Sequence, residues 1–118
     1  MLSRDIYLNT VATSGCIYKI STKQKINLNL FFVSVSNDIE ISIDTTDFNK
    51  SVVSKFILKN KLILNKTNYF LTTFNFHNKI YLNVSEGITT LARANYLSKL
   101  NNSKSFFDNR LKKEILTY

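Results

Sequence analysis

Strict alternation of apolar and polar residues is the feature that most limits what this chain can fold into. In residues 38–44 (DIEISID) an isoleucine occupies every second position. Residues 79–84 (KIYLNV) repeat the pattern, and three apolar residues share one side of it: Ile80, Leu82 and Val84. Successive side chains of a β-strand point to opposite faces, so a period of two predicts strands that bury one face.

Further strands are expected before and between these two. Residues 69–76 place Phe70, Phe74 and Phe76 on one face, and Tyr69 and Leu71 on the other. Weaker patterns predict strands near Asp5–Asn9 and Cys16–Ile20. Together these segments predict a meander of seven or eight strands in the first 84 residues.

The segment 25–36 changes its pattern halfway. Ile26, Leu28 and Leu30 alternate with asparagines, but after Phe31 the apolar residues move to Val33 and Val35. A shift of one residue turns every side chain to the other face of a sheet. We therefore expect a bulge or a bend near residues 30–32, or a strand that passes from one sheet layer to another.

Turns must be made almost without glycine or proline, because the chain contains two Gly and no Pro. Asn is the residue that best replaces Gly where the backbone needs a positive φ. Three tight hairpin turns are therefore predicted, at Asn37-Asp38, Lys59-Asn60 and His77-Asn78.

The last 34 residues have a helical pattern. In residues 88–100 apolar residues recur at spacings of three and four, and Ser85 is a candidate cap. Residues 105–108 (SFFD) fit a capping box for a second helix. The predicted fold class is α+β: an antiparallel β meander, sandwich or half-barrel over residues 5–84, then an α-helical hairpin over residues 86–117. A chain of 118 residues is expected to be a single domain, with residues 1–84 as its β-rich part and residues 85–118 as the helical hairpin.

The charge balance is strongly basic. Sixteen Lys and Arg residues stand against eight acids, which leaves a net charge of +8 and a pI near 9.7. This balance suits a polyanionic partner such as RNA, DNA or an anionic membrane surface. The chain is also rich in residues with A/T-rich codons, including 15 Asn and 12 Ile. Coding bias alone is therefore the alternative explanation for the lysines.

Between Phe48 and Ser85 the chain contains six lysines and no acidic residue. Ammonium groups without neighbouring acids attract phosphates. A second basic set lies in the C-terminal third, where Arg has persisted against A/T-rich coding and offers a planar fork for phosphate or for an internal carboxylate. We predict RNA-phosphate contacts by Lys55, Lys59, Lys61, Lys66, Lys79, Arg93, Arg110, Lys112 and Lys113.

Two tyrosines in the acid-free segment are candidates for stacking on unpaired bases. Tyr69 and Tyr81 would do so if their rings face outward. The alternative is ordinary packing at strand edges.

The residues that carry catalysis or bind metals are not arranged in a recognisable pattern. Asp38, Glu40 and Asp44 share the polar face of one predicted strand, where solvated carboxylates are expected. His77 lies in a predicted turn, and Cys16 has no His partner. Two glycines do not suffice for a glycine-rich phosphate loop. We therefore expect no catalytic residue, no metal and no cofactor.

Residues 78–84 (NKIYLNV) and 91–94 (LARA) resemble the last strand and first helix of the epsilon subunit of F-type ATP synthases. A β-region followed by a helical hairpin is also similar to that family's layout. The glycines and the Pro-containing loop of the family are missing here. The resemblance implies a non-catalytic protein subunit of a bioenergetic complex, with the helical hairpin as its docking surface.

These observations favour a non-catalytic, structural RNA-binding subunit of a large ribonucleoprotein, and in particular an organelle-encoded ribosomal protein. Its expected partners are ribosomal RNA and neighbouring protein subunits, with no small-molecule substrate and no membrane-spanning segment. The expected location is an organelle, the mitochondrion ahead of the plastid; an A/T-rich bacterium or a virus or plasmid stays open as the source. The alternatives are the subunit of a bioenergetic complex and a small stand-alone binding module.

Overall fold

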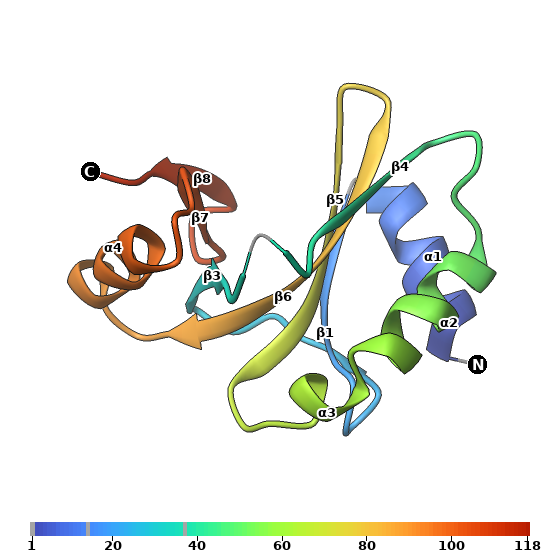
Figure 1. The fold of residues 1–118 in the computed structure, drawn as a ribbon, viewed down its shortest axis with the longest axis horizontal. Helices are drawn as coiled ribbons and strands as arrows, with labels where there is room; N and C mark the ends of the chain where they lie inside the picture. The colour runs from blue at the N-terminus through green and yellow to red at the C-terminus, as the bar shows by residue number, and fades with distance from the viewer. Residues whose placement is uncertain (1, 14, 37) are drawn as a thin grey trace.

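The computed structural model describes residues 2–13, 15–36 and 38–118, which form eight strands and four helices (Figure 1). All the strand pairs are antiparallel and join into one open sheet. The helices are α1 (Leu2–Thr13), α2 (Lys50–Lys59), α3 (Lys61–Leu64) and α4 (Leu91–Leu100). The strands are β1 (Gly15–Lys19), β2 (Gln24–Lys25), β3 (Phe31–Ser34), β4 (Ile41–Asp44), β5 (Tyr69–Phe76), β6 (Lys79–Ile88), β7 (Ser105–Asp108) and β8 (Lys113–Leu116).

Strand β6 organises the sheet, whose order is β2-β1-β5-β6-β3-β7-β8 with β4 also paired to β6. One edge of β6 pairs with β5 along its length. The other edge pairs first with β4 and then with β3, so these two strands follow one another along it. The predicted turn at Asn37-Asp38 includes Asn37, which lies outside the described residues. The strands on either side of it pair with β6 and not with each other.

The main core lies between the sheet and helices α1, α2 and α3 (Figure 1). The predicted inward face of β6 is confirmed, because Ile80, Leu82 and Val84 are at most 2% exposed. They pack with residues such as Val53 and Phe56 of α2. Burying each of these side chains contributes roughly 1.5–3 kcal/mol, so this face supplies much of the stability of the fold.

A second core forms where α4 packs on β3 and β7. Val33 belongs to it, together with Ala94 and Phe106. The neighbouring Phe32 points to the other face of the sheet, where it contacts Ile17 and Phe70. Strand β3 is thus buried on both faces. Residues 25–36 do not form one strand, since β2 pairs with β1 whereas β3 pairs with β6 and β7.

The predicted strand near Asp5–Asn9 is wrong, because these residues belong to helix α1. The helix buries Ser3, Ile6 and Thr10, which are spaced by three and four residues. The Thr10 hydroxyl is satisfied by the Ile6 carbonyl oxygen at 2.8 Å and by the Thr73 hydroxyl at 2.6 Å. A buried threonine and a buried serine hide the helical period from a count of apolar residues.

The predicted hairpin at Lys59-Asn60 is also wrong, because helices α2 and α3 meet there. Helix α2 is capped at its start by Asn49, whose side-chain oxygen accepts from the Ser51 and Val52 amides. At its end the Asn60 amide donates to the Phe56 carbonyl oxygen. Two short apolar runs around an Asn suit either a hairpin or a pair of helices, and burial beneath the sheet decides between them.

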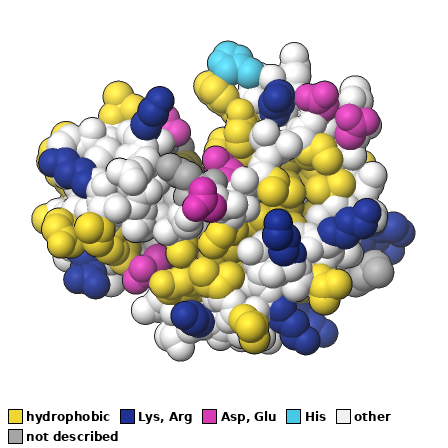
Figure 2. Space-filling view, viewed as in Figure 1, with side chains coloured by type: hydrophobic (Ala, Val, Ile, Leu, Met, Phe, Trp, Pro, Cys, Tyr) yellow, Lys and Arg dark blue, Asp and Glu magenta, His cyan; other side chains and the backbone are white. Residues whose placement is uncertain are grey.

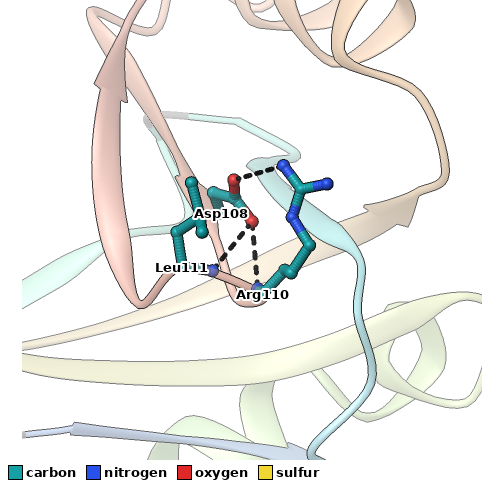
Figure 3. Close-up of polar contacts among 3 residues, drawn as sticks. All are labelled: Asp108, Arg110 and Leu111. Carbon is teal, nitrogen blue, oxygen red and sulfur yellow. Dashed lines mark hydrogen bonds and ion pairs between the residues drawn. The ribbon is translucent and has the colours of Figure 1, made fainter.

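The helical hairpin predicted for the C-terminus is replaced by one helix and a β-hairpin. Asp108 does not help to cap a helix. Its Oδ1 accepts from the Arg110 amide at 2.9 Å and the Leu111 amide at 3.3 Å, and so forms the β7–β8 turn (Figure 3). Lys112 completes the turn with a φ of 56°. With two strands at this end, the layout no longer matches that of the ATP synthase epsilon subunit.

Helix α4 is confirmed, but it begins later than predicted. Strand β6 continues to Ile88, and Thr90 is the cap, accepting from the Arg93 amide at 3.3 Å. The helix buries Ala94, Asn95 and Ser98, whereas the predicted apolar stripe leaves Leu91, Tyr96 and Leu100 exposed.

The tight turn predicted at His77-Asn78 is confirmed between β5 and β6. Both residues have positive φ, 51° and 63°, which is the backbone of the favoured two-residue hairpin turn. This turn sets the register in which β5 faces β6, and that register positions the candidate site.

Candidate nucleic-acid interface

The face of β5 and β6 that points away from the helices, here called the open face, carries aromatic and polar side chains. Residues on this face alternate with those of the main core, and on the two strands they are Phe70, Thr72, Phe74, Phe76, Lys79, Tyr81, Asn83 and Ser85. Far from the β5–β6 turn this face is covered, since Phe70, Asn83 and Ser85 are at most 6% exposed. Phe74 is 41% exposed and Phe76 56% exposed. These two exposed rings lie together on one sheet face with the Tyr81 ring, and such a contiguous aromatic surface is a candidate binding surface.

Phe74 and Tyr81 form a stacked pair toward the β5–β6 turn on this face. They are direct cross-strand partners, and their ring centroids are 4.7 Å apart with planes only 9° from parallel. In the same row of the sheet, Gly15 of β1 lies opposite Phe74 and Ser42 of β4 lies opposite Tyr81. The row therefore places no larger side chain against the outer face of either ring.

Gly15 has a structural reason to lack a side chain. A Cβ atom there would lie 2.6 Å from the Thr73 carbonyl oxygen and 3.2 Å from the Cα of Phe74. The close approach of β1 to β5 thus requires glycine, and the same glycine keeps space open beside the Phe74 ring.

A cleft of about 1000 Å³ reaches Phe74 of the stacked pair, and it is lined by residues of the sheet and of the β7–β8 hairpin. A notch between the smaller lobe, with α4, β7 and β8, and the larger one is visible in Figure 2. The floor of the cleft is polar. The Thr72 and Ser85 hydroxyls are 3.0 Å apart, and the Asn83 side-chain nitrogen donates to the Ser34 hydroxyl at 2.8 Å. This floor offers hydrogen-bonding groups beside an aromatic surface.

Glu40 brings a carboxylate into the cleft. Its Oε1 accepts from the Asn83 side-chain nitrogen at 3.4 Å. Burial raises the pKa of this carboxyl above its ordinary value. No Lys or Arg nitrogen of the described residues lies within 4 Å of it. A half-buried carboxylate without a cationic partner is unexpected in a chain with sixteen cations.

Three lysines line the cleft as well, namely Lys25, Lys112 and Lys113. The Lys112 ammonium donates to the side-chain oxygens of Asn27, at 3.0 Å, and Asn109, at 2.7 Å. The Lys25 ammonium donates to the Asn9 side-chain oxygen at 3.3 Å. These neutral partners hold the ammonium groups in place without cancelling their charge.

The structure brings four of the predicted site residues to the open face or its cleft. Tyr81 is half of the stacked pair, Lys79 faces the same way beside Phe76, and Lys112 and Lys113 line the cleft. Tyr69 lies on the opposite face of the sheet and packs against the main core.

The other predicted phosphate contacts lie elsewhere. Lys55, Lys59 and Lys61 are exposed on α2 and α3, which cover the opposite face, and Lys66 follows α3. Arg93 is exposed on α4. Arg110 forms an ion pair with Asp108 at 3.5 Å (Figure 3). On the face shown in Figure 2 the basic side chains are spread over both lobes and do not form a single patch.

Sequence reasoning missed Phe74, Phe76 and Glu40 as site residues. The signal that could have identified the two phenylalanines is the set of residues that share their strand face. Thr72 shares their face of β5, and Asn83 and Ser85 share the matching face of β6. A strand face that mixes aromatic and hydrogen-bonding residues differs from the wholly apolar face of Ile80, Leu82 and Val84, and this difference indicates which face can bind a polar ligand.

Comparison with protein-family models, with curated proteins and with solved structures finds no match for this chain. In the described ranges, no helix has the length and apolarity needed to cross a membrane. The same residues contain no group of three or more His, Cys, Asp or Glu side chains that could hold a metal ion.

Proposed function

We propose that this protein is a non-catalytic RNA-binding subunit that holds single-stranded RNA on the open face. The observation that carries the proposal is the stacked pair of Phe74, which is 41% exposed, and Tyr81, which is half-buried, flanked in its row by Gly15 and Ser42. Bases inserted above the glycine and above the serine would extend the stack on either side. Stacking of a base on an aromatic side chain contributes about 1–3 kcal/mol.

The charges of the chain support a polyanionic ligand. Among the described residues only one ion pair forms, between Arg110 and Asp108, although the chain carries sixteen cations. Most of the positive charge is therefore not neutralised internally. On the open face Lys79 lies beside Phe76 at one end, and Lys112 and Lys113 line the cleft. Phosphates on either side of the stacked bases would meet these ammonium groups.

Small size, a basic balance and A/T-rich coding favour a ribosomal RNA as the ligand and an organellar ribosome as the assembly. In such an assembly a large RNA would also reach the lysines of α2 and α3 on the opposite face. Binding there would follow the phosphate backbone and carry no sequence information.

A second candidate function is that of a protein subunit that binds no RNA. Leu58 and Leu62 favour it, since they project from α2 and α3 with 74% and 87% of their area exposed. Apolar side chains this exposed suit contact with a neighbouring protein. The two functions are separated by whether the isolated protein binds RNA.

Fluorescence anisotropy with a labelled single-stranded oligo(U) RNA tests the proposal. We expect binding that weakens with salt, with a slope of about −0.7 in log–log form for each phosphate contact. A variant with Lys79→Ala and Lys113→Ala should bind more weakly and with a shallower slope. The control variant, Lys55→Ala and Lys59→Ala, removes the same charge from the opposite face and should bind this short RNA almost normally.

Two results would count against the proposal. The first is an affinity for oligo(U) that is no greater than that for an unrelated polyanion such as heparin fragments and insensitive to loss of Phe74. The second is an equal loss of affinity in the two double-lysine variants, which would mean that charge alone, and not the open face, holds the RNA.

A further inference from the structure

A base stacked on the outer face of Tyr81 would lie above Ser42 of β4. Along an extended chain, side chains two positions apart share a face and are separated by about 6.8 Å. Asp44 therefore flanks Ser42 within β4. Glu40 directly precedes β4, and its hydrogen bond from Asn83 places it on the open face on the other side of Ser42. The edge of such a base would come within reach of one of these two carboxylates.

The surroundings of the two carboxylates differ. Asp44 is exposed and lies directly opposite Lys79 in the register of β4 and β6. Glu40 lies diagonally from Tyr81, a separation of about 7–8 Å that long side chains span. It is half-buried in the cleft and is held by Asn83, which is itself 6% exposed. Glu40 is thus the carboxylate that has a hydrogen-bond partner on the open face and is partly shielded from water.

The position of Glu40 beside the slot over Ser42 sets a chemical requirement on the base. A carboxylate has two acceptor oxygens and no donor, so it matches a base edge with two adjacent N–H donors. Guanine has such an edge, with N1–H and the N2 amino group. Adenine and cytosine place an acceptor nitrogen beside their amino group, and uracil places carbonyl oxygens on both sides of its single N–H. Resting on the proposed function, we propose that Glu40 makes the slot over Ser42 selective for guanine.

The test uses oligo(U) RNAs that carry a single central guanosine, inosine, adenosine or uridine, with anisotropy as the readout. We expect the guanosine RNA to bind about tenfold more tightly than oligo(U), which corresponds to about 1.4 kcal/mol. Inosine lacks the N2 amino group and should give a smaller gain. Adenosine should give none. This comparison changes only the RNA, so it does not depend on how a variant folds.

The protein-side test is Glu40→Gln, which keeps the size of the side chain. We expect this variant to lose the advantage of guanosine and to bind oligo(U) at least as well as the wild type. The matched control is Glu86→Gln, which makes the same change on the helix-covered face and should retain the preference for guanosine.

The outcomes separate the inference from the proposed function. Equal affinity of the wild type for all four RNAs, or a guanosine preference that survives Glu40→Gln, would overturn the role of Glu40 while leaving RNA binding intact. Absence of binding to every RNA would overturn the proposed function and the inference together.

Discussion

The two faces of β5 and β6 are made by the same strands and differ in almost every property. The helix-covered face carries Leu71, Ile80, Leu82 and Val84, all at most 2% exposed. The open face carries hydroxyl and amide groups in its middle and exposed aromatic rings toward the hairpin. No residue is shared, because consecutive side chains of a strand point to opposite faces.

The difference separates stability from binding within one hairpin. Substitutions at Ile80, Leu82 and Val84 should act on folding, whereas substitutions at the exposed end of the open face, at Phe74, Phe76 and Lys79, should act on the ligand. Single substitutions on each face test this difference, because the expected effect of each on stability or on RNA binding is distinct.

The largest effect is expected from Leu82→Ala, which opens a cavity in the main core. Leu82 is fully buried, and such a truncation costs about 2–5 kcal/mol. Urea denaturation followed by circular dichroism measures the loss. The comparison variant is Phe76→Ala, on the exposed part of the open face, which should change stability by about 0.5 kcal/mol or less. Similar losses in the two variants would mean that the exposed end of the open face is also part of the core.

The second effect concerns RNA affinity. Phe74→Ala removes half of the stacked pair, and losing one stacked base costs about 1–3 kcal/mol. We therefore expect affinity for oligo(U) to fall by roughly 5- to 150-fold, measured by anisotropy. Phe74→Tyr keeps a ring in place and should restore most of the affinity. If Phe74→Ala and the wild type bind equally well, the stacked pair is not the binding surface.

The third effect tests the slot beside Tyr81. Ser42 is exposed and small, and Ser42→Leu would place an apolar side chain against the outer face of the tyrosine ring. Loss of one stacking position should weaken RNA binding by about tenfold, or about 1.4 kcal/mol, with little change in stability. The control is Thr46→Leu, outside the strands in the loop after β4. Unchanged binding by Ser42→Leu would place the RNA on the Gly15 side alone.

The smallest effect is on the pH dependence of stability. Burial raises the pKa of Glu40 above its ordinary value of 4.5, so the folded state binds the proton more tightly than the unfolded state does. Stability should therefore fall as pH rises through the window from 4.5 to the raised value. Glu40→Gln removes this titration and should be slightly more stable than the wild type at neutral pH.

Urea denaturation checks this expectation at two pH values, neutral pH and about pH 4, the second of which is close to the ordinary pKa of a glutamate. The difference between Glu40→Gln and the wild type should shrink in acid. A difference that grows on acidification would show that the Glu40 carboxylate is stabilising in the folded state.

Much of the central sheet was predictable from residue pattern alone. The period of two identified β5 and the inward face of β6, and the His77-Asn78 pair identified their turn. Such features depend on residues that are neighbours in the chain, so they can be predicted from the sequence. The N-terminal helix was not predicted, because Thr10 and Ser3 take buried positions that a pattern of apolar residues does not reveal.

The prediction of a helical hairpin at the C-terminus was wrong for a related reason. Asp108 has the right type and position for a capping box, but the same side chain closes a β-turn equally well. Pairing of β7 with β3 decides the matter, and that pairing joins segments far apart in the chain. The local residue pattern therefore does not predict this pairing.

Of the candidate site, the sequence predicted Tyr81 as a stacking residue and Lys79, Lys112 and Lys113 as phosphate contacts, but it did not predict how these residues lie relative to one another. Glu40 was assigned to a solvated strand face. Its true setting depends on Asn83 from β6 and on the β7–β8 hairpin at the cleft. The Glu40 carboxylate acquires that setting only when its own segment, β6 and the β7–β8 hairpin come together.

The sequence by itself determined which residues alternate, where one tight turn forms and how much positive charge the chain carries. These properties follow from the chirality of the backbone, the conformations open to Asn and His, and simple composition. Only the tertiary structure decided which face of each strand is covered. Helix packing is cooperative across the whole chain, so burial on one side and exposure on the other are settled together, and with them the place where a ligand can bind.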